Sequence, residues 1–130
     1  MQDKSAVSWI ILVTDDYQLS KEFYSSKLGF AIEREVAAEE FCQFSLGNCF
    51  VAIYGRSFFQ KLLPAGVLKQ SGGAVYSFKD STDIDADFIE LKSNGVQFIK
   101  EPTTQPWGQR TAYFTDPDGH LWELQQWLTS

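Results

Sequence analysis

The stretch that decides the fold lies near the carboxyl end of the chain and reads RTAYFTDPDGHLWELQQW, residues 110–127. Two runs rich in apolar and β-branched residues flank Asp-Pro-Asp-Gly at 116–119, and tight turns favour these residue types. We therefore expect two antiparallel strands joined by this turn. Period-two alternation then places Glu123 on the opposite face from Trp122 and Leu124, which we expect to pack on a helix.

The same order of elements can be read twice along the chain. Each half gives a strand, a helix and three further strands, and each helix ends at a glycine, Gly29 or Gly95. Ser20 or the Asp15-Asp16 pair can cap the first helix, and Asp83 or Asp85 can cap the second. The predicted elements are strand 8–14, helix 19–27, strands 30–36, 40–46 and 49–54 with a hairpin at Gly47-Asn48, then strand 74–79, a helix through 88–92, and strands 96–100, 110–115 and 121–127.

The fold class is therefore α+β, with tandem βαβββ modules forming a curved mixed sheet around a cleft. We predict one domain made of module 6–55, connector 56–72 and module 73–127, with one helical turn near 58–63 in the connector. A four-stranded sheet with a helix on one face is too small to hide its second face alone. The two sheets are therefore expected to curl toward each other, whether the halves pair within one chain or across a dimer.

Composition excludes several classes of partner. The 130 residues include 17 acidic and 11 basic side chains, a formal net charge of −6, and 15 % are aromatic. The pI near 4.6 and the absence of a Lys/Arg cluster in the sequence argue against nucleic acid. The apolar run 7–13 is too short for a signal peptide or a membrane span, so we expect a cytoplasmic protein with no membrane partner. Cys42 and Cys49 are expected to stay free thiols, because the hairpin register puts Cys49 opposite a residue near Leu46.

Two motifs and the repeat carry a resemblance to a known family. The motifs are TDDY at 14–17, which leads into Phe23-Tyr24 and Leu28-Gly29-Phe30, and YFTDPDGHLWEL at 113–124. With the tandem βαβββ order, they make nearly the whole chain resemble the vicinal oxygen chelate superfamily. Its members include glyoxalase I, extradiol dioxygenases, fosfomycin-resistance transferases and bleomycin-resistance binding proteins. Function varies widely on this scaffold, so the resemblance alone selects no reaction.

Enzymes of this superfamily usually hold a divalent metal on four inward-pointing positions. Carried over one at a time, these positions fall on Trp9, at or next to Tyr54, on Ala74 and on Glu123. One carboxylate cannot replace the three or four N, O or S ligands of a catalytic metal. We therefore expect no metal and no cofactor, and no metal-dependent glyoxalase, dioxygenase or fosfomycin chemistry. His120 is expected to serve the turn that contains it.

Six residues form the predicted site. Glu123 either anchors a cationic or hydroxylated ligand, or acts as a general base, or is a carboxylate satisfied by Arg110 or a tyrosine hydroxyl. Arg110 either pairs with an anionic group of the ligand or is a charged residue exposed to solvent. The aromatic residues could stack a flat or cationic ligand, or fill space, and Trp107 could rim the cleft or contact a partner subunit. The substrate-binding candidates are Trp9, Tyr54, Trp107, Arg110, Tyr113 and Glu123, and the catalytic candidates among them are Glu123 and Tyr113.

Three functional hypotheses stay open. The first is a metal-independent small-molecule binding protein of the glyoxalase/bleomycin-resistance type, a homodimer that sequesters an aromatic or cationic ligand in an aromatic-lined cleft. The alternative is a glyoxalase-like lyase or isomerase with Glu123 as general base and Tyr54 or Tyr113 as proton donor or oxyanion stabiliser. The third is a structural dimer whose cleft has collapsed. A bond from Glu123 to a tyrosine in a closed apolar pocket would favour catalysis, and pairing with Arg110 in an open trough would favour binding.

Overall fold

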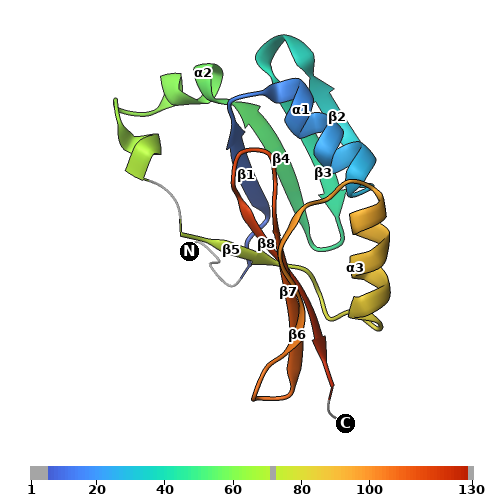
Figure 1. Ribbon diagram of the computed structural model, residues 1–130. Coiled ribbons are helices and arrows are strands. Elements are labelled where there is room, and N and C mark those ends of the chain that lie inside the picture. The colour runs from blue at the N-terminus through green and yellow to red at the C-terminus, as the bar shows by residue number, and fades with distance from the viewer. Residues whose placement is uncertain (1–5, 71–72, 129–130) are drawn as a thin grey trace. The chain divides into compact units, whose positions relative to one another are not determined.

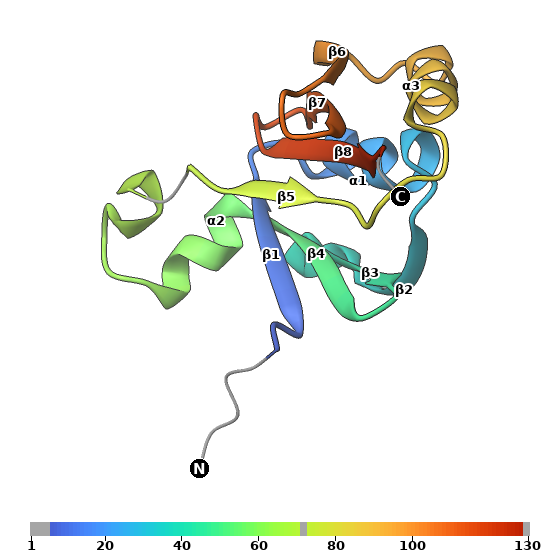
Figure 2. The same cartoon turned by 90° about the horizontal axis from the view of Figure 1, so that it is seen from below.

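A computed structural model describes residues 6–70 and 73–128 of the chain. The chain divides into two compact units, 1–71 and 72–130, and Figures 1 and 2 show the helices and strands of each. Each unit contains a four-stranded mixed sheet and a helix between its first and second strands. The predicted α+β class and the repeated βαβββ order are confirmed.

The strands of the two sheets follow the same order. In the first unit the elements are β1 (Trp9–Thr14), α1 (Tyr17–Glu22), β2 (Ala31–Val36), β3 (Phe41–Leu46), β4 (Cys49–Gly55) and α2 (Arg56–Phe59). In the second unit they are β5 (Val75–Ser77), α3 (Ile84–Ser93), β6 (Phe98–Thr104), β7 (Gln109–Thr115) and β8 (Leu121–Trp127). The sheet orders are β1-β4-β3-β2 and β5-β8-β7-β6, and in each sheet the first strand runs parallel to the last.

The first helix differs from the continuous α-helix predicted over 19–27. It begins at Asp16, whose carboxylate accepts the Leu19 N–H at 3.1 Å, so the cap comes from the Asp15-Asp16 pair. After α1 it widens into a π-helical turn, Phe23–Lys27, in which the Leu28 N–H donates to the Phe23 carbonyl at 3.0 Å. Gly29, at φ 77°, then ends the helix in the left-handed geometry that the sequence predicts.

Two strands of the second unit also differ from their predicted lengths. β5 covers only part of 74–79, and β6 begins at Phe98 and continues to Thr104 instead of spanning 96–100. The pairing of β6 with β7 is interrupted by register shifts on either side of Lys100. Pro102 cannot donate a ladder hydrogen bond, but β6 is an outer strand and its pairing is irregular at this point. The strand can therefore continue past the proline.

Each unit has its own apolar core on the helix side of its sheet. In the first unit the Tyr24 and Phe44 rings are fully buried with centroids 5.9 Å apart. The Tyr17 hydroxyl donates to Glu35 at 2.5 Å, and Glu35 also accepts from Lys21 at 2.9 Å. In the second unit the core consists of Ile84, Val96, Ala112, Phe114, Trp122 and Leu124.

The cysteines are free thiols, as the sequence predicts. Cys49 stands opposite Leu46 across the β3–β4 hairpin, and Cys42 lies buried further along β3. Burial raises the pKa of the Cys42 thiol to about 11, so it stays protonated at neutral pH.

None of the described helices has both the length and the apolar character that a membrane crossing requires.

Candidate functional site

One face of the second sheet presents polar side chains from three neighbouring strands. Strand alternation and register place on this face Ser77 of β5, Gln109, Thr111 and Tyr113 of β7, and Glu123 and Gln125 of β8. Trp122 and Leu124, 3 % and 6 % exposed, lie on the other face. Gln126 shares that face and accepts the Ile84 N–H at the start of α3. The prediction that Glu123 faces away from the helix is therefore confirmed.

Both carboxylate oxygens of Glu123 accept a hydrogen bond from a hydroxyl. Tyr113 donates to Oε2 at 2.6 Å and Ser77 donates to Oε1 at 2.7 Å. The three residues meet because Glu123 stands opposite Tyr113 in the antiparallel pair and opposite Ser77 in the parallel pair. The hydrogen bond to Glu123, with burial adding to it, raises the pKa of the Tyr113 phenol. Tyr113 is therefore a proton donor at neutral pH.

Two glutamines extend this network to the indole of Trp107. Gln125 donates to Ser77 Oγ at 3.1 Å, and its own amide oxygen accepts from Gln109 at 2.7 Å. The Trp107 Nε1–H donates to the amide oxygen of Gln109 at 2.8 Å. Trp107 is 61 % exposed, so its indole is held at the nitrogen by Gln109 while the residue stays accessible to solvent. Trp107 and Glu123 thus belong to one hydrogen-bonded network.

Sequence analysis missed three members of this network, namely Ser77, Gln109 and Gln125. The two glutamines lie at period-two positions from Tyr113 and Glu123, so alternation alone could have put them on the same face. Ser77 carries no comparable signal, because its place beside Glu123 depends on the register of the parallel β5–β8 pair.

Arg110 lies on the other face of the sheet and is not brought to Glu123. Its guanidinium forms an ion pair with Asp85 of α3, with Nη2 2.8 Å from Oδ1 and Nε 3.1 Å from Oδ2. This pairing lowers the pKa of the Asp85 carboxyl. The alternative in which Arg110 satisfies Glu123 is therefore wrong, and the tyrosine alternative is confirmed through Tyr113. A ligand-binding role for Arg110 stays a prediction.

Trp9 and Tyr54 belong to the first unit and share one face of its sheet. Trp9 of β1 stands opposite Phe50 of β4, and Tyr54 of β4 stands opposite Val13 of β1. Trp9 and Tyr54 are therefore four residue positions apart along the strands, roughly 13 Å. Trp9 is 42 % exposed and its ring lies 5.0 Å from that of Phe50. The Tyr54 ring packs against Phe41 and Phe59. The two rings therefore do not contact each other, and their ligand-binding roles, like the enclosing cleft, stay predictions.

The turn at 116–120 gathers three potential ligand atoms, from Asp116, Asp118 and His120, within 4.8 Å of one another. One oxygen of Asp116 accepts the backbone N–H of both Asp118 and His120, at 3.0 and 2.8 Å. The other lies 2.6 Å from Nδ1 of His120. These contacts hold the turn together, which confirms the structural role predicted for His120.

The residues around Glu123 do not fit the divalent metal that the resemblance implies. A catalytic metal takes three or more N, O or S ligands, and the neighbours of this carboxylate are the side chains of Ser77, Tyr113 and Gln125. Both oxygens of Glu123 already accept hydrogen bonds from two of them. The side chains around Glu123 therefore do not supply the ligand set of a catalytic metal.

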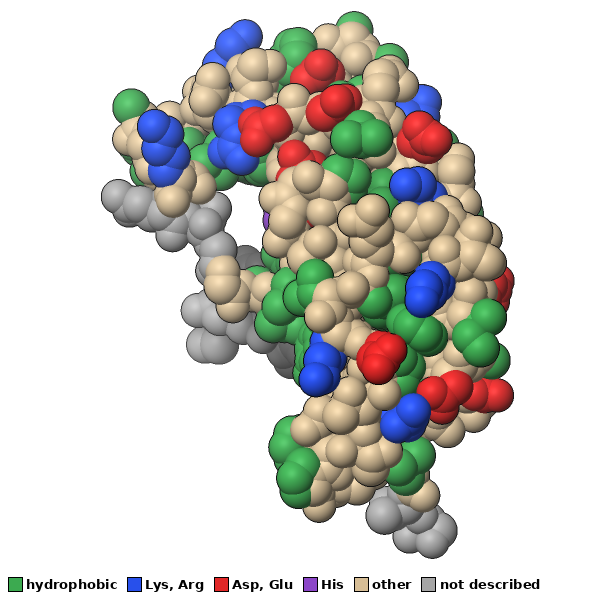
Figure 3. Space-filling model, in the orientation of Figure 1, with side chains coloured by type: hydrophobic (Ala, Val, Ile, Leu, Met, Phe, Trp, Pro, Cys, Tyr) green, Lys and Arg blue, Asp and Glu red, His purple; other side chains and the backbone are tan. Residues whose placement is uncertain are grey.

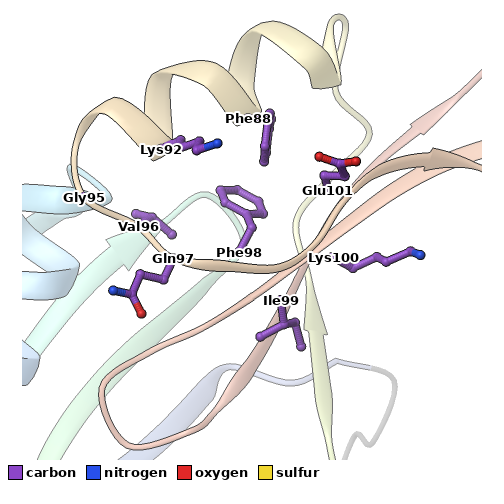
Figure 4. Close-up of a pocket in the computed structure, with 9 residues that line it drawn as sticks. All are labelled: Phe88, Lys92, Gly95, Val96, Gln97, Phe98, Ile99, Lys100 and Glu101. Carbon is purple, nitrogen blue, oxygen red and sulfur yellow. The ribbon is translucent and has the colours of Figure 1, made fainter.

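A groove of about 770 Å³ lies elsewhere in the second unit, between α3 and β6 (Figure 4). The Phe88 and Phe98 rings meet there in a T-shaped arrangement with centroids 4.7 Å apart, and Lys92 Nζ lies 5.5 Å from the centre of Phe88. Ile99 and Lys100 point away from the helix. None of the six predicted site residues lines this groove.

Comparison with known proteins places these units in a family. The profile of the Glyoxalase/Bleomycin resistance protein/Dioxygenase superfamily matches residues 6–124. A protein of Shewanella frigidimarina (strain NCIMB 400), described only as uncharacterized, is 30 % identical over 95 % of this chain and 94 % of its own length. A glyoxalase/bleomycin resistance protein/dioxygenase structure from Nocardioides is 27 % identical, with a TM-score of 0.81 over 100 % of this chain and 88 % of that one. A glyoxalase-related enzyme from Fulvimarina pelagi shares the fold, with 22 % identity and a TM-score of 0.80 over 94 % of this chain and 88 % of that one.

Proposed function

Since the chain belongs to the glyoxalase/bleomycin resistance protein/dioxygenase superfamily, we propose that it binds a small organic molecule on the polar face of the second sheet. The observation that carries the proposal is the pair of hydroxyls on Glu123. They hold the carboxylate in place before a ligand arrives, which lowers the entropic cost of binding. A carboxylate has about four lone-pair positions, so two acceptor positions remain for a ligand.

The charge of Glu123 and the ring of Trp107, at the other end of the same hydrogen-bonded network, indicate the class of ligand that we propose. An ionised carboxylate prefers an ammonium group or another strong hydrogen-bond donor, and the net charge of −6 attracts cations over longer distances. Trp107 supplies an accessible indole that is oriented by the same network, and aromatic faces stabilise cations and flat rings. We therefore propose a ligand that combines a cationic group with an aromatic ring.

A homodimer remains the proposed assembly, to be checked by sedimentation equilibrium.

The experiment compares tryptamine, an aromatic ammonium ion, with indole, which has the same ring without the charge. Calorimetric titration should show tryptamine binding that Glu123→Gln weakens at least about tenfold, because a charged hydrogen bond is lost. Glu90→Gln is the matched control, since it removes the same charge from an exposed position on α3. Equal affinity for indole, or unchanged affinity in Glu123→Gln, would contradict the proposal.

A second candidate function, a lyase or isomerase, is supported by the short contact between Tyr113 and Glu123. A carboxylate acceptor and a protonated phenol 2.6 Å apart could remove a proton from carbon and stabilise the resulting oxyanion. The side chains of Ser77 and Gln125 beside the carboxylate are polar, however, and do not form the closed apolar pocket that would favour catalysis. Turnover of the hemithioacetal of methylglyoxal and glutathione, abolished in Glu123→Gln, would favour this second candidate over binding alone.

A further inference from the structure

The connector that follows β4 lines an open cavity within the first unit. It folds as α2 and two short 3₁₀ turns, Gln60–Leu62 and Val67–Gln70, and the open cavity that they line has a volume of about 750 Å³. All of its lining residues belong to the connector itself, among them Arg56, Gln60, Lys61, Leu63, Leu68 and Lys69. The volume lies in the range of small-molecule sites.

Every charged side chain that lines this cavity is positive. Arg56, Lys61 and Lys69 line it, and no Asp or Glu does, although the whole chain has six more acidic than basic residues. Figure 3 shows Lys and Arg side chains over this part of the molecule, at the upper left. The three residues are too widely spaced to form a cluster in the sequence, which is why the sequence predicts no basic cluster. The turns of the connector bring them around one cavity.

Arg56 is the cation with acidic neighbours, because it also lines an adjacent pocket together with Asp15 and Glu40. Arg56 Nε lies 2.6 Å from Asp15 Oδ1. Lys61 Nζ lies 5.3 Å from the centre of the Phe58 ring, and no carboxylate of residues 6–70 or 73–128 pairs with Lys61 or Lys69. Asp15 offsets part of the positive charge of Arg56, and an anion placed among the three cations would relieve the repulsion that remains.

We propose that this cavity binds an organic anion, whose carboxylate or phosphate group is held by Arg56, Lys61 and Lys69. Guanidinium and ammonium groups both form charge-assisted hydrogen bonds with such anions. Leu63 and Leu68 are half-buried lining residues that offer apolar contact to the body of the ligand. The ligand has the opposite charge from the one proposed for Glu123, so the two sites are chemically distinct.

The test uses 1-naphthyl phosphate and 1-naphthoate as anions, inorganic phosphate as an anion without an apolar body, and neutral 1-naphthol. In calorimetric titrations we expect one or both aromatic anions to bind, inorganic phosphate to bind more weakly, and naphthol to show no binding. Lys61→Gln and Lys69→Gln should each weaken the anion about fivefold, the effect expected for one exposed charge pair. Comparison of the phosphate with the carboxylate identifies the preferred anionic group.

Lys79→Gln is the matched control, because it changes the net charge equally in an exposed residue of the second unit that does not line the cavity. It should leave anion binding unchanged, and so should Glu123→Gln. The net charge of −6 disfavours nonspecific anion binding, so measured affinity reports a local site. The proposal would be overturned if neither aromatic anion bound, if naphthol bound as tightly as the anions, or if both lysine variants bound the anion as tightly as the unmodified chain does. None of these results bears on tryptamine binding, so the two proposals fail separately.

Discussion

At the residue scale, Gly55 shows how one position fixes where the connector begins. It is the last residue of β4, and its N–H donates to the Glu40 carbonyl at 2.8 Å. A Cβ added at Gly55 would lie 2.8 Å from the Cβ of Glu40, closer than real Cβ contacts. Glu40 itself has a φ of 52°, in the left-handed region that favours glycine. The two backbones therefore approach each other so closely that side chains compete for the same space.

Gly55→Ala is expected to lower the free energy of unfolding by about 1–3 kcal/mol, the range for overpacked sites. Urea denaturation followed by circular dichroism measures this change. Glu40→Gly removes the opposing Cβ and relieves the positive φ, so the Glu40→Gly/Gly55→Ala double variant should be more stable than Gly55→Ala alone. Equal stability of these two variants would show that the contact with Glu40 is not the cause.

Individual site residues were predictable to different degrees. The orientation of Glu123 followed from alternation with Trp122 and Leu124, because a strand with one buried face leaves no other choice. The partner of Arg110 did not follow, because Asp85 reaches it from α3 and the sequence does not encode which helix side chain lies opposite a strand position. Local periodicity thus gives the face of a residue, and tertiary packing decides its partner.

At the element scale, α3 depends on its N-cap, Asp83, which directly precedes its first residue. The Asp83 carboxylate accepts the Ala86 N–H at 3.1 Å and so satisfies one of the unpaired donors at the helix start. Asp83→Ala should cost about 1 kcal/mol in urea denaturation, and Asp83→Asn should retain most of the stability. If both variants unfold at the same urea concentration as the unmodified chain, the cap does not stabilise the helix.

Element types were predictable along most of the chain, whereas irregular segments were not. The strands around Gly47-Asn48 and around the Asp-Pro-Asp-Gly turn matched closely, because turn residues and alternation define both ends. The π-helical turn Phe23–Lys27 and the bulged β6 were missed. Both depend on how the backbone adjusts to neighbouring elements, and neither leaves a period that can be counted in the sequence.

At the scale of the whole molecule, acid should destabilise both units. The pKa of Glu35 is lowered, mainly by the hydrogen bond from Tyr17 and also by Lys21, and Arg110 lowers that of Asp85. A carboxyl with a lowered folded-state pKa stabilises the fold above its unfolded value, about 4. This stabilisation is lost as the pH falls through the lower, folded value. Urea midpoints should therefore fall below about pH 4.5.

Glu35→Gln should reduce this loss between pH 5 and roughly pH 3, because its carboxyl no longer takes up a proton on unfolding. Glu33→Gln is the matched control, because it removes the same charge from an exposed position of the same strand. A pH profile of Glu35→Gln that parallels the profile of the unmodified chain would contradict the assignment.

On the alkaline side, burial raises the pKa of Tyr17, and the hydrogen bond to Glu123 raises the pKa of Tyr113. Their contribution to the free energy of unfolding is complete below the unfolded value, about pH 10, and is lost as the pH rises above it through the folded values.

The overall architecture followed from the repeat, but the connector cavity did not. Two matching helices, each with an aspartate cap and a terminal glycine, were enough to predict the tandem modules. Arg56, Lys61 and Lys69 surround one cavity only because two short turns fold the connector back on itself. Sequence separation therefore concealed the basic group that the folded chain assembles.

The π-helical turn has a consequence for how the two halves correspond. From the capping aspartate to the left-handed glycine, the first helix spans positions 16 to 29 and the second spans 83 to 95, so the first contains one additional residue. The wide turn takes up this insertion inside the helix, and both landmarks keep their geometry. An alignment of the halves therefore requires a single gap within 23–27. A variant that lacks one residue of the segment 23–27 should form an uninterrupted α-helix that is still followed by β2.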